Sequence, residues 1–73
     1  MPSTTIELYG KRQFYFSIDL PVSRIEVLDA LKDAFESRGT YAANAKSQSV
    51  VIPYARLSSC VILLTENTDA ETN

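Results

Sequence analysis

Two stretches near the N-terminus alternate between apolar and polar residues. In the first stretch, Ile6 and Leu8 alternate with polar neighbours. In the second, large apolar side chains occupy every other position, namely Phe14, Phe16, Ile18 and Leu20. A period of two is typical of a strand with one face in a core. Because Gly10 and Lys11 lie between the stretches, the pattern predicts an antiparallel hairpin.

The segment that follows Pro21 has the pattern of an amphipathic helix with both ends marked. Ser23 and Glu26 have the spacing of a capping box, which starts a helix. Apolar residues then recur every three or four positions, namely Val27, Leu28, Leu31, Ala34 and Phe35. Gly39 is expected to take the left-handed conformation that ends a helix. We therefore predict a helix over 23–38 that lies on the apolar face of the hairpin.

The second half of the chain has weaker signals. Residues 40–49 are small and mostly polar, and they are predicted to form a connection. Residues 50–54 indicate a short strand, and Pro53 within it favours a position at the edge of a sheet. Residues 60–64 form a continuous aliphatic run, which is typical of a strand in the middle of a sheet. Cys60, at the start of this run, is expected to be buried.

The order of these elements is strand, strand, helix, short strand, strand. It predicts a single α+β domain over residues 1–66, with frayed residues 1–4 at its start and a disordered acidic tail over 67–73. If the last strand pairs in parallel with the first, the sheet is mixed and has the β-grasp, or ubiquitin-like, order. An antiparallel β-β-α-β-β sandwich is the alternative, and the pattern alone does not separate the two.

The helix, the small loop, V-V-I-P-Y and A-R-L-S-S-C-V-I-L-L resemble, in order and spacing, the ubiquitin-like sulfur carriers typified by ThiS and the small subunit of molybdopterin synthase. The resemblance covers residues 5–66 and implies a β-grasp fold. It also implies sulfur transfer from the thiocarboxylate of a C-terminal Gly-Gly. This chain instead ends in D-A-E-T-N and contains no Gly-Gly, so no functional residue carries over from that family.

Composition narrows the class of function. The 73 residues are 45% hydrophobic and 22% charged, as in an ordinary globular domain. The net charge of -2 and the lack of a basic cluster argue against nucleic-acid binding. With no His and a single Cys, the chain has no evident catalytic base, metal site or cofactor site, and we expect it not to be an enzyme. No apolar run is long enough to span a membrane, so the expected location is the cytoplasm.

The remaining candidate residues suit the binding of a partner. Alternation predicts that Tyr9 and Tyr15 share the sheet face that the helix leaves open, and tyrosines are enriched in interface hot spots. Basic residues at the hairpin tip and after the short strand would form a rim beside them. The candidate partner-binding residues are Tyr9, Lys11, Arg12, Tyr15, Tyr54 and Arg56. The simpler interpretation is that tyrosines are common in strands because of their β-propensity.

We therefore expect a small non-catalytic regulator or adaptor. It would bind a protein partner, or a second copy of itself, through the open sheet face or through the edge strand 50–54. Two alternatives stay open. One is a ubiquitin-like carrier of sulfur or another group, and the other is a binder of single-stranded nucleic acid that uses the tyrosines and nearby basic residues.

Overall fold

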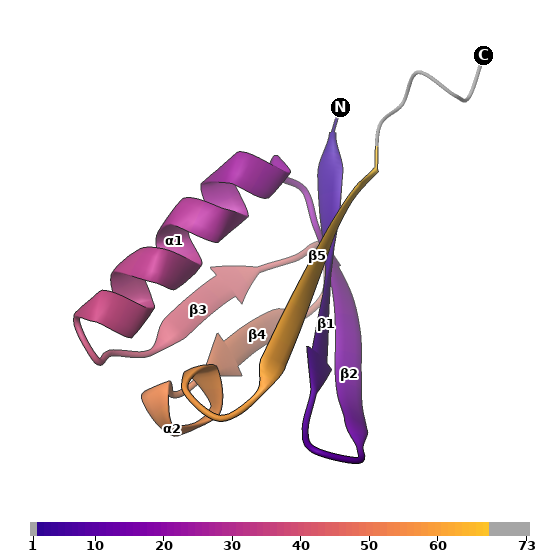
Figure 1. Cartoon of the computed structure of the whole chain (residues 1–73). Helices are drawn as coiled ribbons and strands as arrows, with labels where there is room; N and C mark the ends of the chain where they lie inside the picture. The colour runs from indigo at the N-terminus through magenta and orange to yellow at the C-terminus, as the bar shows by residue number, and fades with distance from the viewer. Residues whose placement is uncertain (1, 68–73) are drawn as a thin grey trace.

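The computed structural model describes residues 2–67 of the chain. The elements are β1 (Ser3–Tyr9), β2 (Phe14–Leu20), α1 (Arg24–Glu36), β3 (Tyr41–Asn44), β4 (Ser49–Ile52), α2 (Tyr54–Leu57) and β5 (Val61–Asn67). In Figure 1, both helices and the β3–β4 pair lie on one side of the sheet that contains β1, β2 and β5. The protein is therefore a small α+β domain with two layers. Of the predicted tail, Asn67 belongs to β5, and residues 68–73 lie outside the described part.

All strand pairings in the described part of the chain are antiparallel. The larger sheet has the order β2-β1-β5, and β3 and β4 form a separate two-stranded sheet. Ser3 pairs with Asn67 at one end of the β1–β5 ladder, and Tyr9 pairs with Val61 at the other. The predicted parallel pairing of the last strand with the first is therefore wrong, and the β-grasp topology is not confirmed.

The physical reason lies in β3, a strand that the sequence pattern did not predict. Its residues fall within 40–49, which were expected to form a simple connection. The β3–β4 hairpin reverses the chain once more, so that β5 starts at the end of the sheet where β1 stops. The hairpin is closed by the Ala45 N–H, which donates to the Gln48 carbonyl at 2.6 Å. Because β4 belongs to a two-stranded sheet, the predicted edge position of this strand is confirmed.

The core lies between the three-stranded sheet and the second layer. Its buried residues come from almost every element, and they are Ile6, Ile18, Leu20, Val27, Leu31, Ala34, Tyr41, Val50, Ile52 and Leu57. Ile6 is fully buried at the centre of β1, where it is paired with Ile18 on β2 and Leu64 on β5. The predicted packing of the helix on the apolar face of the hairpin is confirmed.

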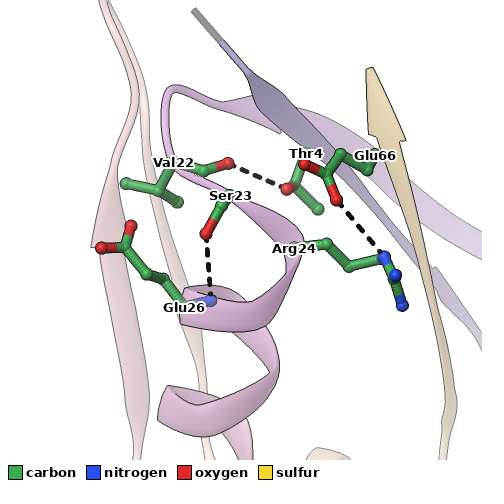
Figure 2. Close-up of polar contacts among 6 residues, drawn as sticks. All are labelled: Thr4, Val22, Ser23, Arg24, Glu26 and Glu66. Carbon is green, nitrogen blue, oxygen red and sulfur yellow. Dashed lines mark hydrogen bonds and ion pairs between the residues drawn. The ribbon is translucent and has the colours of Figure 1, made fainter. Parts of the chain in front are cut away.

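The start of α1 is tied to the sheet by polar contacts, which Figure 2 shows. The Ser23 hydroxyl accepts a hydrogen bond from the Glu26 N–H at 3.3 Å, so the predicted N-cap is confirmed. The Thr4 hydroxyl donates to the Val22 carbonyl at 2.9 Å, and Arg24 Nε lies 3.5 Å from a Glu66 carboxylate oxygen on β5. Thr4 is fully buried in β1, so the predicted fraying of residues 1–4 is wrong for this position.

Helix α1 ends at Glu36, two residues earlier than the predicted end at residue 38. Ser37 is the C-cap, and Arg38 takes the left-handed conformation with a φ of 56°. The Gly39 N–H donates to the Ala34 carbonyl at 2.8 Å, and the Arg38 N–H donates to the Phe35 carbonyl at 3.2 Å. These two bonds form a Schellman motif. The left-handed residue is therefore Arg38 rather than Gly39, because the motif is counted from the helix end at Glu36.

Candidate interaction surfaces

A β-bulge in β2 changes which aromatic side chains share a face. Leu8 pairs with Phe16, but Tyr9 pairs with Phe14, so Tyr15 is an extra residue in β2. An extra residue inverts the alternation beyond it. Phe14 therefore lies on the open face with Tyr9, where the two ring centroids are 5.3 Å apart. The predictions that Phe14 faces the core and that Tyr15 shares the face of Tyr9 are both wrong for this reason.

The face of the larger sheet that points away from α1 is bare of helices in the described chain (Figure 1). Four large side chains gather at one end of it, namely Tyr9, Phe14, Val61 and Leu63. Tyr9 on the central strand lies between Phe14 and Val61, which are 51% and 64% exposed, and Leu63 is 49% exposed. We call these four residues the open-face cluster. Contiguous exposed apolar side chains are a feature that many protein interaction sites share.

The other end of the same face is polar. The Thr5 hydroxyl is hydrogen-bonded to the Asp19 carboxylate, and the Asn67 amide donates to the Thr5 hydroxyl at 2.9 Å. Glu7 and Ser17 pair across the strands between this polar end and the open-face cluster. The face is therefore divided along the strands into an apolar half and a polar, acidic half.

Tyr15 turns toward α2 instead. Arg56 Nη1 donates to the Tyr15 hydroxyl at 3.2 Å, and the guanidinium carbon lies 5.2 Å from the centre of the ring. A Cβ atom on Gly10 would lie 2.8 Å from the same ring, so any larger residue there would require the Tyr15 ring to shift. Lys11 and Arg12 follow in the exposed turn. The basic residues and Tyr15 thus lie at the hairpin end of the molecule.

Tyr54 occupies a third location. It is the first residue of α2, and its ring centroid lies 5.7 Å from that of Phe35 on α1. Of the predicted site residues, only Tyr9 belongs to the open-face cluster. The sequence pattern does not place Phe14 on the open face, because the pattern does not show the bulge. It does not place Val61 and Leu63 there either, because the aliphatic run is typical of a buried strand.

A second apolar surface borders the outer strand β5. A groove of about 370 Å³ separates it from the helices, and its apolar lining is Leu28, Leu31, Phe35, Leu57, Ile62 and Leu64. Leu28 and Phe35 were predicted to belong to the core stripe of the helix, but they are 38% and 47% exposed. They project from α1 at this groove, beside the narrower stripe of Val27, Leu31 and Ala34 that the core buries.

The titratable residues add little chemistry. Burial raises the pKa of the Tyr41 phenol above its ordinary value. Cys60 is half-buried rather than fully buried as expected. It lies just before β5, and its sulfur is 3.9 Å from the Ser59 hydroxyl. Within residues 2–67, no three His, Cys, Asp or Glu side chains are grouped so that they could hold a metal ion. None of the helices in this range is long and apolar enough to cross a membrane.

Comparison of the chain with models of protein families, with curated proteins and with solved structures found no match. The interpretation of the two apolar surfaces therefore rests on their geometry and chemistry.

Proposed function

We propose that this chain is a small, non-catalytic and cytoplasmic protein-interaction module, which acts as a regulator or adaptor. The observation that carries the proposal is the open-face cluster. Two aromatic rings and two aliphatic side chains are held side by side on a sheet, and no other part of the described chain covers them. A rigid, preformed aromatic surface loses little conformational entropy when a partner docks.

The polar half of the face supports the same proposal. Protein interfaces combine an apolar centre with a polar rim, and aromatic residues account for a large share of their hot spots. Tyr9 and Phe14 form such a centre. Asp19 and Asn67 lie beyond it with side chains already fixed by hydrogen bonds to Thr5, so they offer a rim of defined geometry.

The two alternative functions have less support. The carrier hypothesis drew on a parallel β-grasp order, whereas β5 runs antiparallel to β1. A nucleic-acid surface needs positive charge to neutralise phosphates, but the open face contains the carboxylates of Glu7 and Asp19. The basic side chain of Arg56 lies against Tyr15 at the hairpin end instead.

Binding assays with matched variants test the proposal. The full chain is immobilised, the partner that it captures from its native source is identified by mass spectrometry, and the affinity of the purified pair is measured by calorimetry. Phe14→Ser is expected to weaken binding by more than about tenfold, the effect of losing one aromatic hot spot. Circular dichroism checks that the variant is folded.

Val51→Ser on β4 is the control, because Val51 is also an exposed apolar side chain, at 63%, but lies outside the open-face cluster. The control variant should bind as the unmodified chain does. Equal affinities of the unmodified chain and the Phe14→Ser variant, or a larger loss with Val51→Ser, would show that the open-face cluster is not the docking surface.

A further inference from the structure

The outer strand β5 lacks the features that normally protect the edge of a sheet. It is seven residues long, it contains no proline or lysine, and its register with β1 runs from end to end without a bulge. Edge strands are usually interrupted, charged or covered, because their free N–H and C=O groups accept another strand. Within residues 2–67, no strand pairs with the far side of β5.

The other edge of the same sheet is different. Strand β2 contains the bulge at Tyr15, and a groove beside it is lined by residues of both β2 and β4, among them Phe16 and Val50. Strands β3 and β4 are only four residues long each. The edge of β5 is therefore the long and regular one that the fold leaves available.

The sequence of β5 is that of a central strand. Residues 61–64 are aliphatic on both faces of the strand, a pattern found where both neighbours are strands and both faces are covered. In a single copy of the chain, none of these side chains is buried, and Val61 and Leu63 are about half to two-thirds exposed. The pattern and the position disagree, and a strand paired on the free edge of β5 would supply the second neighbouring strand that the pattern indicates.

We propose that the occupant of this edge is a second copy of the chain, paired antiparallel through β5 about a two-fold axis. The pairing joins two three-stranded sheets into one six-stranded sheet in which β5 is central. The pairing is made by the backbone edge of β5 and does not depend on the proposed function, although Val61 and Leu63 of the open-face cluster belong to the same strand. The helices of both copies lie on the same face, because a two-fold axis perpendicular to a sheet preserves its faces.

Side-chain matching selects the register. A two-fold axis at Leu63 places this residue opposite its own equivalent and places Ile62 opposite Leu64 of the second copy. All central cross-strand pairs are then aliphatic, which favours this alignment. Glu66 remains outside the paired segment, where it keeps its contact with Arg24 of the same chain.

Helix α1 supplies a second self-complementary element. It packs over β5 and β1, next to the free edge, and Ile25, Leu28 and Phe35 project from it in an exposed apolar row at helical spacing. Two copies of α1 related by the axis run antiparallel and close the groove between α1 and β5 from both sides. The charges agree with this direction, since Arg24 at one end of α1 is brought toward Glu36 at the other end of its equivalent.

The area that the pairing must bury is a modest share of the surface. A stable interface buries about 800 Å² on each partner, and the whole chain exposes 5160 Å². The paired residues 61–65, the three large side chains of the helix and the groove between them form the contact surface of each copy. A second copy offers the matching strand edge, the apolar helix row and the reversed charges together.

Cysteine cross-linking tests the register. In a Cys60→Ser background, Leu63→Cys places two thiols directly opposite each other, within the Cα separation of about 4.4–6.8 Å that a disulfide needs. Thr65→Cys is the matched control on the same face of β5, because its two thiols would be about 13 Å apart along the strands. With oxidised glutathione, Leu63→Cys should form a covalent dimer at least tenfold faster than Thr65→Cys. Equal rates would overturn the register.

Mass measurement tests the association itself. Sedimentation or light scattering should give twice the chain mass of 8.1 kDa, and Leu28→Glu on the helix row should halve that mass while circular dichroism stays unchanged. Phe14→Ser and Val51→Glu, which lie on other surfaces, should remain dimeric. A monomer at concentrations up to about 1 mM, where the interface would contribute only about 4 kcal/mol, or a dimer unaffected by Leu28→Glu, would overturn the proposal. A dimer that Phe14→Ser dissociates would also overturn it.

Discussion

Thr4 offers the sharpest test of how the two layers are joined. It is the one fully buried polar side chain in the described core, and its hydroxyl donates to the carbonyl of Val22, just before the N-cap of α1. Thr4→Val keeps the shape of the side chain and removes the donor. Because water cannot reach Thr4 in the folded protein, the lost bond has no replacement at that position.

The expected cost follows from these contacts. A hydrogen bond contributes about 0.5–1.5 kcal/mol net to the free energy of unfolding. An acceptor that loses its partner causes a further loss of stability, which grows with the burial of that acceptor. Val22 is only half-buried, so its carbonyl regains part of its hydration. The additional methyl group of valine offsets a further part. We expect Thr4→Val to lower the free energy of unfolding by about 1–2 kcal/mol, out of a total of about 4–11 kcal/mol for a chain of this length.

Urea denaturation followed by circular dichroism measures the loss, with two companion variants. Thr65→Val, an exposed threonine on β5, is the control and should change stability by less than about 0.5 kcal/mol. Thr4→Ser keeps the donor and should retain the protection from hydrogen exchange of the buried Val27 N–H, which donates to the Ser23 carbonyl at 3.2 Å, and Thr4→Val should accelerate that exchange. If Thr4→Val were as stable as the unmodified chain and left that exchange unchanged, the hydrogen bond to Val22 would not hold the helix to the sheet.

Three further outcomes are expected. Ile6→Val should cost about 0.5–1.5 kcal/mol and Ile6→Ala about 2–5 kcal/mol in urea denaturation, since the side chain is fully buried between two neighbouring strands, and equal small losses would contradict that packing. Gly10→Ala should displace the Tyr15 ring. A double-mutant cycle between Tyr15 and Arg56 should therefore show a coupling energy of about 0.5–1 kcal/mol when residue 10 is glycine and almost none when residue 10 is alanine. The raised pKa of Tyr41 means that the folded state disfavours the phenolate. The stability that the neutral phenol contributes is complete below the pKa of 10.0 in the unfolded chain, and it is lost as the pH rises through the higher pKa in the folded protein. Tyr41→Phe should therefore lose less stability than the unmodified chain in urea titrations above pH 10, and identical pH profiles would contradict the assignment.

The elements that the sequence predicts well are those whose signals are local. Alternation marks β1 and β2 because one face of each is buried, and Ser23 marks the start of α1 because its hydroxyl binds the Glu26 N–H directly. Strand β3 has no such signal. Its alanines and asparagine have low strand propensity, and it is held in place by the burial of Tyr41 and by pairing with β4.

The candidate site was harder to predict, because it depends on register. A single bulge moves Phe14 onto the open face and Tyr15 toward Arg56, and hairpin geometry rather than composition decides where a bulge forms. Tyr9 was placed correctly because it precedes the bulge. The direction of β5 depends in turn on how many times the chain reverses its direction before β5. Because the sequence pattern did not predict β3, it predicted a parallel rather than an antiparallel pairing of β5 with β1.

The pairing of β1 with β5 also has a consequence for the order of events during synthesis. Strand β1 is synthesised before the other strands described, yet one of its two neighbours is the last of them. Ser3 therefore cannot pair until Asn67 has been synthesised. Closing so long a loop is slow, and it requires the residues up to Asn67 to have left the ribosome. Until Val61 and the residues after it emerge, the nascent β1–β2 hairpin presents the unfilled edge of its central strand. We expect chains that are cut short before Val61 to aggregate rather than to fold.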